Sequence, residues 1–265
     1  MAFEQLKERQ SVAWGAAPFE NVEDSLAVMH DDLVRRLDPQ AGELWLDLAC
    51  GAGAVAMRAA RAGADVTGLD LSPVMIDTAR RRAAEDGLEI AYEVGDAENL
   101  PYEDAHFDVV SSSVGVFLAP DHAAVARELT RVVRPGGRIG FTAWRPSSRV
   151  EKSVRLTAQF QPPPPDGAGY PFDWGTEEHV SELLGVAFEL EFHDGDAPER
   201  GETGEAIWER TLAGVGPVRM LYDSLEPGRR EEFHRAAVSM YEEDRVGDEI
   251  VMPGPYLLTL GRRKR

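Results

Sequence analysis

Two glycines, Gly51 and Gly53, stand between a short apolar run and an alanine-rich segment, and they constrain the fold more than any other feature. The pattern at residues 43–48 is typical of a buried strand, and residues 54–62 are typical of a helix. Glycine in such a turn lets the backbone approach a ligand closely, while the start of the helix presents unpaired amides. The sequence therefore predicts a strand–turn–helix unit that binds a ligand.

The same alternation of strands and helices continues to about residue 145. Further strands are predicted at 65–69, 88–94, 107–111 and 138–144, and helices at 73–86 and 121–133. Short strands that alternate with helices imply right-handed crossovers and a parallel sheet with helices on both faces. The predicted fold class is α/β, preceded by an amphipathic N-terminal helix at residues 21–37.

The second half of the chain is less regular. Residues 161–175, QPPPPDGAGYPFDWG, hold five prolines and three glycines, which predicts a loop or lid. A sixth strand is predicted at 186–192 and three helical pieces at 201–246. Residues 250–260 are predicted to form a strand at the edge of the sheet, or a bulged one, because prolines interrupt the run.

The charge balance restricts the partners of the protein. The chain has 47 Asp and Glu against 28 Lys and Arg, a formal net charge of −19, which disfavours nucleic acid and anionic membranes as partners. No run of about 18 apolar residues and no signal peptide is found. The single cysteine, Cys50, excludes a disulfide within the chain and favours a cytoplasmic location. A small-molecule partner is expected.

Three carboxylates refine the predicted ligand. Asp70 ends the second strand 19 residues after Gly51, where it can bind a ribose diol, so the pair indicates an adenosine-containing cofactor and leaves a nicotinamide cofactor open. Asp47 would repel a pyrophosphate at the loop but suit the ammonium of a methionine moiety. Asp96 ends the third strand and can accept a hydrogen bond from an adenine amino group. The Tyr-x-x-x-Lys pair of one dehydrogenase class is absent.

Five runs together resemble the class I methyltransferases, in the branch grouped with ubiquinone- and menaquinone-biosynthesis enzymes and natural-product enzymes. They are LDLACGAG at 46–53, GLDLSP at 68–73, GDAENLP at 95–101, FDVV at 107–110 and LTRVVRPGG at 129–137. The resemblance implies a Rossmann-like, seven-stranded, mostly parallel sheet and S-adenosyl-L-methionine as cofactor. The resemblance covers about residues 40–145, the expected cofactor-binding core. With the pattern of the second half, one domain is expected at 1–265, with a lid or loop and a helix at 146–185 and a helical insertion at 195–247 that forms part of the substrate pocket.

The resemblance assigns cofactor roles residue by residue. Asp47, Ala49, Gly51 and Gly53 would form the loop around the methionine moiety, and the commonest family pattern has glycine where Ala49 stands. No loss of binding is expected from this alanine. The ribose would bind Asp70. The remaining contacts would come from residues at the ends of the strands: Leu71, Met75, Asp96, Ala97, Ser112 and Ser113.

No catalytic residue can be assigned from the sequence. Methyl transfer from a sulfonium needs in-line alignment and exclusion of water, and it needs a base only when the acceptor arrives protonated. The candidate bases are His106, His122, His179 and His193. His106 and His122 are expected in surface turns, and His179 lies at an acidic helix start that does not favour catalysis. Cys50 is expected to pack rather than react, and because no histidine pair has the spacing of metal ligands, no metal is expected.

Aromatic residues around the loops are the candidates for a substrate pocket. They are Trp14, Phe19, Phe117, Trp144, Tyr170, Trp174 and Trp208, with Trp14 and Phe19 as a flap before the first helix. The predicted function is methyl transfer to an oxygen, nitrogen or carbon atom of a small molecule by a monomer or homodimer. The alternatives are an NAD(P)-dependent oxidoreductase of similar shape and a non-catalytic protein that binds S-adenosylmethionine.

Overall fold

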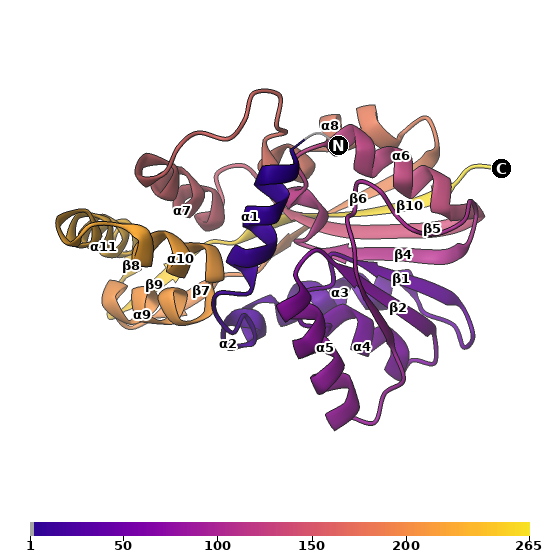
Figure 1. Ribbon diagram of the computed structural model, residues 1–265, viewed down its shortest axis with the longest axis horizontal. Helices are drawn as coiled ribbons and strands as arrows, with labels where there is room; N and C mark the ends of the chain where they lie inside the picture. The colour runs from indigo at the N-terminus through magenta and orange to yellow at the C-terminus, as the bar shows by residue number, and fades with distance from the viewer. Residues whose placement is uncertain (1–2) are drawn as a thin grey trace.

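The structure is a computed structural model that describes residues 3–265, without the side chains of Asn21 and Asp24. Its centre is a seven-stranded sheet in the order β3-β2-β1-β4-β5-β10-β6 (Figure 1). The strands are β1 (Leu44–Leu48), β2 (Asp65–Asp70), β3 (Ala91–Val94), β4 (Phe107–Ser113), β5 (Val133–Trp144), β6 (Phe188–Asp196) and β10 (Pro255–Arg263). Only β10 runs antiparallel to its neighbours β5 and β6. The predicted seven-stranded, mostly parallel sheet is confirmed.

Helices cover both faces of this sheet. The crossovers from β1 to β2 and from β2 to β3 run in one direction along the sheet, and the crossover from β4 to β5 runs in the other. Because such crossovers are right-handed, α4 (Ala54–Arg61) and α5 (Pro73–Glu85) lie on one face and α6 (His122–Val132) on the opposite face. Contacts pair α3 (Ala27–Leu37) with α4, and α8 (Glu177–Leu184) with α6.

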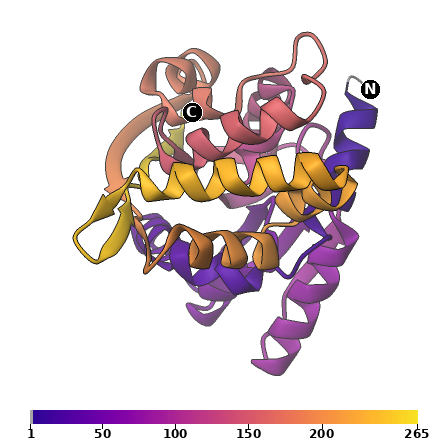
Figure 2. The same ribbon diagram turned by 90° about the vertical axis from the view of Figure 1, so that its left-hand side faces the viewer.

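A second, smaller core lies at the side of the sheet, in the orange helices of Figure 2. It is built from α9 (Gly204–Gly214), α10 (Gly216–Ser224) and α11 (Pro227–Glu242), with a small sheet of β7 (Glu199–Gly201), β8 (Arg245–Val246) and β9 (Glu249–Met252). The three helices match the three predicted helical pieces. None of the helices described in residues 3–265 is both long and apolar enough to cross a membrane.

The N-terminal region differs from the sequence prediction. Residues 21–37 do not form one helix: α2 (Glu20–Glu23) and a 3-10 turn, η1 (Asp24–Leu26), precede α3. The hydroxyl of Ser25 donates a 2.7 Å hydrogen bond to the carbonyl of Val22, and such local bonds compete with regular helix. A further helix, α1 (Glu4–Trp14), was not predicted. Trp14 therefore ends a helix rather than lying in a flap before the first one.

The predicted edge strand at 250–260 is wrong. The segment forms two strands, β9 and β10, and β10 lies inside the sheet between β5 and β6. The prolines do not disturb it, because Pro253 lies between the two strands and Pro255 is the first residue of β10. Proline is tolerated at the first residue of a strand, and the rest of β10 donates to both neighbours.

The remaining elements connect β5 to β6. They are α7 (Arg149–Thr157) and the 3-10 turns η3 (Ala158–Phe160) and η4 (Pro171–Gly175), which lie on either side of the proline-rich segment. One more 3-10 turn, η2 (Val116–Leu118), follows β4. In Figure 1, α1 runs across the end of the sheet where β1, β2 and β4 finish, beside the group formed by α9, α10 and α11. The carboxyl ends of the parallel strands and α1 therefore enclose the region described next.

Candidate functional site

A cavity opens at the carboxyl edge of β1, β2, β3 and β4. The loops after these four strands form its floor, and α1 supplies one wall through Lys7, Gln10, Ser11 and Trp14. Ligands of open α/β sheets bind at this edge of the strands. The cavity therefore lies where a cofactor site is expected.

The turn after β1 has the backbone conformation that its glycines predict. Ala49, Gly51 and Gly53 have φ angles of 53°, 53° and 86°, all in the left-handed region. A Cβ on Gly53 would also lie 2.4 Å from the hydroxyl of Tyr92, so only glycine fits there. Ala49 adopts the same conformation at a cost of roughly 1–2 kcal/mol relative to glycine.

Asp70 is fixed beside this turn. Its carboxylate accepts hydrogen bonds of 2.8 Å from the backbone N–H of Gly51 and 2.8 Å from that of Ser72. Burial raises the pKa of Asp70, and these N–H donors oppose that shift by stabilising the ionised form. The side chain thus connects the ends of β1 and β2 and lines the cavity.

Asp47 also lines the cavity, but its oxygens already have partners. They accept hydrogen bonds from the backbone N–H of Ala56 at 2.9 Å and from the hydroxyl of Ser111 at 2.8 Å. Burial raises the pKa of Asp47 to about 7. The carboxylate therefore orders the start of α4, and a bound ammonium would share oxygens that these donors already use.

A lysine that the sequence analysis did not identify contacts Asp96. Lys7 of α1 donates hydrogen bonds of 2.6 Å to Asp96 and 2.9 Å to Glu98. Burial acts to lower the pKa of Lys7, but the two carboxylates outweigh it and raise the pKa. The ion pairs fasten α1 across the cavity, and part of the Asp96 carboxylate is thereby used before any ligand binds.

The other predicted cofactor residues are divided between the cavity wall and the interior. Leu71, Met75, Ala97 and Ser113 line the cavity. Ser112 does not, because it is 3% exposed and its hydroxyl accepts a 3.1 Å hydrogen bond from the N–H of Val116. The structure therefore brings all the predicted cofactor residues together at one edge, with Ser112 supporting the loop from behind.

Of the predicted substrate aromatics, only Trp14 and Phe19 line the cavity. Their rings pack edge to face with centroids 5.5 Å apart. The other five belong to the interior or lie away from the cavity. Phe117, Trp144 and Trp174 are buried in the main core, Trp208 is buried in the second core, and the Tyr170 hydroxyl donates a hydrogen bond to Glu151.

Glu23 of α2 and His30 of α3 also line the cavity and were missed by the sequence analysis. His30 of α3 is 5% exposed, and its Nδ1 atom has no hydrogen-bond partner among the described residues. Burial, together with the charge of Arg58, lowers the pKa of His30 to about 3, so the imidazole is neutral at physiological pH. Glu23 accepts a hydrogen bond from Arg82, which also donates a 2.9 Å hydrogen bond to the carbonyl of Ala52. No sequence motif marks either residue.

The four histidines considered as bases do not line this cavity. His106 is exposed, as expected, but His122 is 6% exposed and its Nδ1 lies 2.9 Å from Nε2 of the half-buried His179. The surface expectation for His122 is wrong because Gly169 and Trp174 cover its ring. His193 lies beside Glu191 at 2.8 Å.

Comparison with known families identifies the central part of the chain. Residues 46–137, which contain most of β1, all of β2 to β4 and the start of β5, match the family described as "Methyltransferase domain". These are the elements whose loops form the floor of the cavity. The chain carries a class I methyltransferase domain. S-adenosylmethionine is the methyl donor of such domains, which decides between the adenosine-type cofactors that Gly51 and Asp70 alone left open.

Curated relatives of the methyltransferase domain include proteins of Mycobacterium and Saccharothrix. An uncharacterised protein of Mycobacterium tuberculosis is 40% identical over 162 residues, which cover 61% of this chain and 59% of that protein. The nocamycin O-methyltransferase of Saccharothrix syringae is 32% identical over 202 residues, which cover 73% of this chain and 66% of that enzyme. The chain thus spans about three fifths of the length of the mycobacterial relatives that it matches.

Solved structures support the same fold at low sequence identity. The YcgJ protein of Bacillus subtilis superimposes with a TM-score of 0.62 at 17% identity, covering 92% of this chain and 99% of that protein. The superposition extends well beyond the matched methyltransferase domain. The sheet, including β10 and β6, therefore has the arrangement of this fold.

The residues of the cavity fit S-adenosylmethionine. The glycine turn lets the backbone approach the methionine moiety, and Asp70 presents a fixed carboxylate where the ribose is expected. The unpaired Nδ1 of buried His30 offers a further polar contact to a bound molecule. An unpaired buried polar atom is costly, so a ligand that satisfies it gains affinity.

Proposed function

We propose that the whole chain transfers a methyl group from S-adenosylmethionine to a small organic acceptor. One observation carries the proposal: the cofactor carboxylates and the aromatic pair Trp14 and Phe19 line a single cavity. Binding of two small ligands next to each other is what methyl transfer requires, because donor and acceptor must meet in line. A protein that only senses the cofactor has no need of the apolar surface that Trp14 and Phe19 present beside the cofactor residues.

Bound S-adenosylmethionine would supply a methyl group on a cationic sulfur, and the acceptor lone pair would form the new bond as the carbon–sulfur bond breaks. The residues of the chain position the reactants and exclude water. The ion pairs of Lys7 with Asp96 and Glu98 hold α1 over the cavity. Trp14 and Phe19 present apolar surface on the same side, which displaces solvent from the region of transfer.

His30 is the group of this chain best placed to meet a polar atom of the cofactor or acceptor. Its imidazole is neutral, buried and unpaired at Nδ1. If it contacts the methionine moiety, it serves cofactor binding. If it contacts an acceptor hydroxyl or amine, the neutral imidazole orients that group through a hydrogen bond.

The nature of the acceptor is proposed from charge and from the relatives. A net charge of −19 favours neutral or cationic molecules over anionic polymers. One relative is named for O-methylation of nocamycin, and another is named methyltransferase GfsG of Streptomyces halstedii. These names support the natural-product branch of the resemblance, while the ubiquinone and menaquinone branch stays a prediction.

The helical insertion at 195–247 is proposed to shape the pocket indirectly. Its helices do not line the cavity, but α10 contacts α1, and α9 contacts α2. A Cβ on Gly216 would lie 2.1 Å from the carbonyl of Ala13, so the two helices approach very closely there. Movement of the insertion would therefore move the wall that carries Trp14.

The proposal is tested with S-adenosylmethionine that carries a deuterated methyl group. The protein is incubated with a panel of small alcohols, phenols, amines and carbon nucleophiles, and the products are analysed by mass spectrometry. We expect transfer of the labelled methyl to one class of acceptor, and its loss in Asp70→Ala. Asp77→Ala, an exposed change on α5, serves as the matched control. Cofactor binding with no labelled product from the panel or from a cell extract of small metabolites would contradict the proposal.

A further inference from the structure

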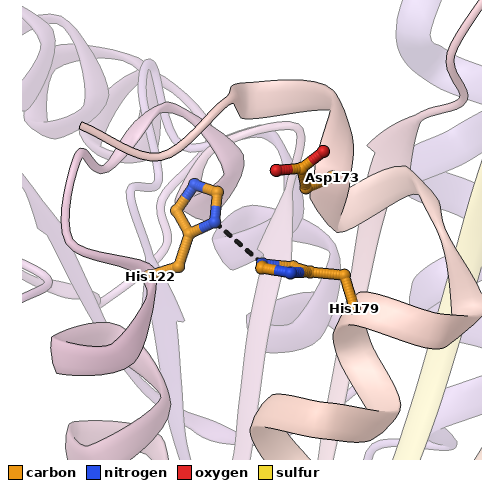
Figure 3. A group of neighbouring side chains, drawn as sticks. All are labelled: His122, Asp173 and His179. Carbon is orange, nitrogen blue, oxygen red and sulfur yellow. Dashed lines mark hydrogen bonds between the residues drawn. The ribbon is translucent and has the colours of Figure 1, made fainter. Parts of the chain in front are cut away.

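Outside the cofactor cavity, three potential metal ligands from three separate elements meet at one point. His122 is the first residue of α6, Asp173 lies in η4 and His179 lies in α8 (Figure 3). Each side chain offers one ligand atom, and all three atoms lie within 4.8 Å of one another. None of the three residues lines the cavity of the methyltransferase domain. The cluster therefore lies outside the site of the function proposed above.

The cluster has more lone pairs than hydrogen-bond donors. Nδ1 of His122 faces Nε2 of His179 at 2.9 Å, and the two nitrogens can share only one proton. Nε2 of His122 is buried without a partner. Among residues 3–265, no group forms a hydrogen bond or an ion pair with the Asp173 carboxylate. In Figure 3 this carboxylate lies beside the gap between the two rings.

The side chains around His122 hold its ring in place. The ring packs against the buried Trp174 with centroids 5.5 Å apart. Gly169 lies so close that a Cβ there would be 2.5 Å from Nε2, and its N–H donates a 2.8 Å hydrogen bond to the carbonyl of Pro120. A ligand that cannot change rotamer is pre-organised, and the apolar shell limits access of water to the metal.

We propose that His122, Asp173 and His179 bind a divalent first-row transition metal, with Zn²⁺ as the expected ion. Two imidazoles and one carboxylate are a common zinc ligand set, with the fourth position taken by water. Zinc–nitrogen bonds of about 2.0–2.1 Å place two tetrahedral ligands about 3.3 Å apart. The nitrogens of the two histidines are already near this separation, and a rotation of the Asp173 side chain would bring its oxygen closer.

The bound ion would have a structural role. It would fasten the start of α6 to η4 and α8, which lie about 50 residues further along the chain. The segment it would secure carries Phe172 and Trp174, two large side chains of the main core. An ion that binds the folded chain and not the unfolded one stabilises the fold by an amount that grows with its concentration. Zinc should therefore raise the melting temperature.

No metal is expected from the sequence because no two histidines have the short spacing that is typical of metal ligands. His122 and His179 are 57 residues apart, and they meet only because α6 packs against α8. Asp173 approaches both residues through η4, in the proline- and glycine-rich segment. A constellation assembled by tertiary packing leaves no pattern along the chain.

The test measures metal binding and stability rather than methyl transfer. The full chain is stripped with a chelator and titrated with Zn²⁺, and its melting temperature is followed in each variant with and without the ion. We expect one Zn²⁺ per chain and a rise in melting temperature for the wild type. The rise should be lost in His179→Gln and Asp173→Asn. His193→Gln is the matched control, because His193 also lies beside a carboxylate, Glu191.

Co²⁺ provides a second readout that does not depend on stability. A cobalt ion bound by two histidines and one carboxylate gives visible absorption bands, and these should appear in the wild type and in His193→Gln only. Each variant is compared with itself without metal, so a lower starting stability does not affect the conclusion. Equal effects of Zn²⁺ on the wild type and on His179→Gln, or no bound metal at all, would overturn the proposal.

Discussion

The carboxyl edge of the sheet and the group formed by α9, α10 and α11 use their most distinctive side chains in opposite ways. At the sheet edge, Asp47 and Asp70 face a cavity and hold backbone N–H groups in a fixed turn. In the helical group, Trp208 and Phe233 turn inward and form a separate core. The glycines and the aspartate of such a turn can therefore be recognised in the sequence. The sequence does not show whether an aromatic side chain points into a cavity or into a core.

The largest effect on stability is expected when the tryptophan of the second core is replaced. Trp208→Ala should lower the free energy of unfolding by roughly 3–5 kcal/mol, because a large buried side chain leaves a cavity. It should leave the dissociation constant of S-adenosylmethionine unchanged in protein that remains folded. Chemical denaturation and calorimetric titration measure the two quantities.

Trp14→Ala is the matched change in the cavity wall and should behave in the reverse manner. It should weaken ligand binding or slow methyl transfer, with a smaller loss of stability than Trp208→Ala, because Trp14 is half buried. If Trp208→Ala weakened binding of S-adenosylmethionine more than Trp14→Ala did, the distinction between the two regions would fail.

Removal of the carboxylate that fixes the glycine turn should act on binding. Asp70→Ala removes an acceptor from the N–H of Gly51 and from the ribose expected beside it. Hydrogen bonds that involve a charged group contribute roughly 1.5–3 kcal/mol, so S-adenosylmethionine should bind roughly 10- to 150-fold more weakly. Asp77→Ala, on the surface of α5, should bind normally. An unchanged dissociation constant in Asp70→Ala would refute the ribose assignment.

Asp47 should give the protein a distinct pH dependence. Its folded pKa of about 7 lies above the unfolded value of 3.8, so the folded state binds the proton more tightly. The contribution of this group to stability is therefore full below pH 3.8 and is lost as the pH rises toward 7. Relative to Asp47→Asn, the wild type should lose on the order of 2 kcal/mol between pH 5 and pH 8. A constant difference across that range would mean that the carboxylate titrates normally.

A smaller effect is expected at Ala49, where the backbone has a φ of 53°. Ala49→Gly should stabilise the fold by about 1 kcal/mol, because glycine adopts the left-handed conformation without strain. For a chain of this size that is a rise in melting temperature of roughly 2–4 °C. Ala60→Gly, in the last turn of α4, is the control and should destabilise. A loss of stability in both variants would contradict the strain at Ala49.

The smallest effect is expected at His30. His30→Ala removes one neutral hydrogen bond to the bound molecule, which contributes roughly 0.5–1.5 kcal/mol. Weaker S-adenosylmethionine binding would place the contact at the methionine moiety, and slower transfer with normal binding would place it at the acceptor. The exposed His106→Ala is the control. Normal binding and normal transfer in His30→Ala would remove this residue from the site.

The sequence predicts the central fold well because its elements are determined locally. Gly51, Gly53 and Asp70 lie at turns whose backbone geometry restricts the residue type, and the sheet follows from the alternation of strands and helices. The N-terminal helix α1 was missed because Glu4–Trp14 has a weak apolar pattern, and its position depends on the ion pairs of Lys7 across the cavity.

The side-chain partners of the site could not be predicted in the same way. His30 is marked by nothing in the sequence, and its exposure depends on helices that meet it only in the folded chain. Trp174 and Trp208 have the composition of pocket residues but pack into two cores. Pro255 indicated an edge strand, yet it is the first residue of β10, where a strand tolerates a residue without an N–H.

The central claim is that the cavity at the sheet edge binds S-adenosylmethionine rather than a nicotinamide cofactor. Isothermal titration of the full chain with S-adenosylmethionine, with its demethylated product S-adenosylhomocysteine and with NADPH and NADH tests it most directly. The account predicts binding of the first two at one molecule per chain, weakened in Asp70→Ala, and no binding of the nicotinamide cofactors. Tight binding of NADPH or NADH with none of S-adenosylmethionine would contradict it.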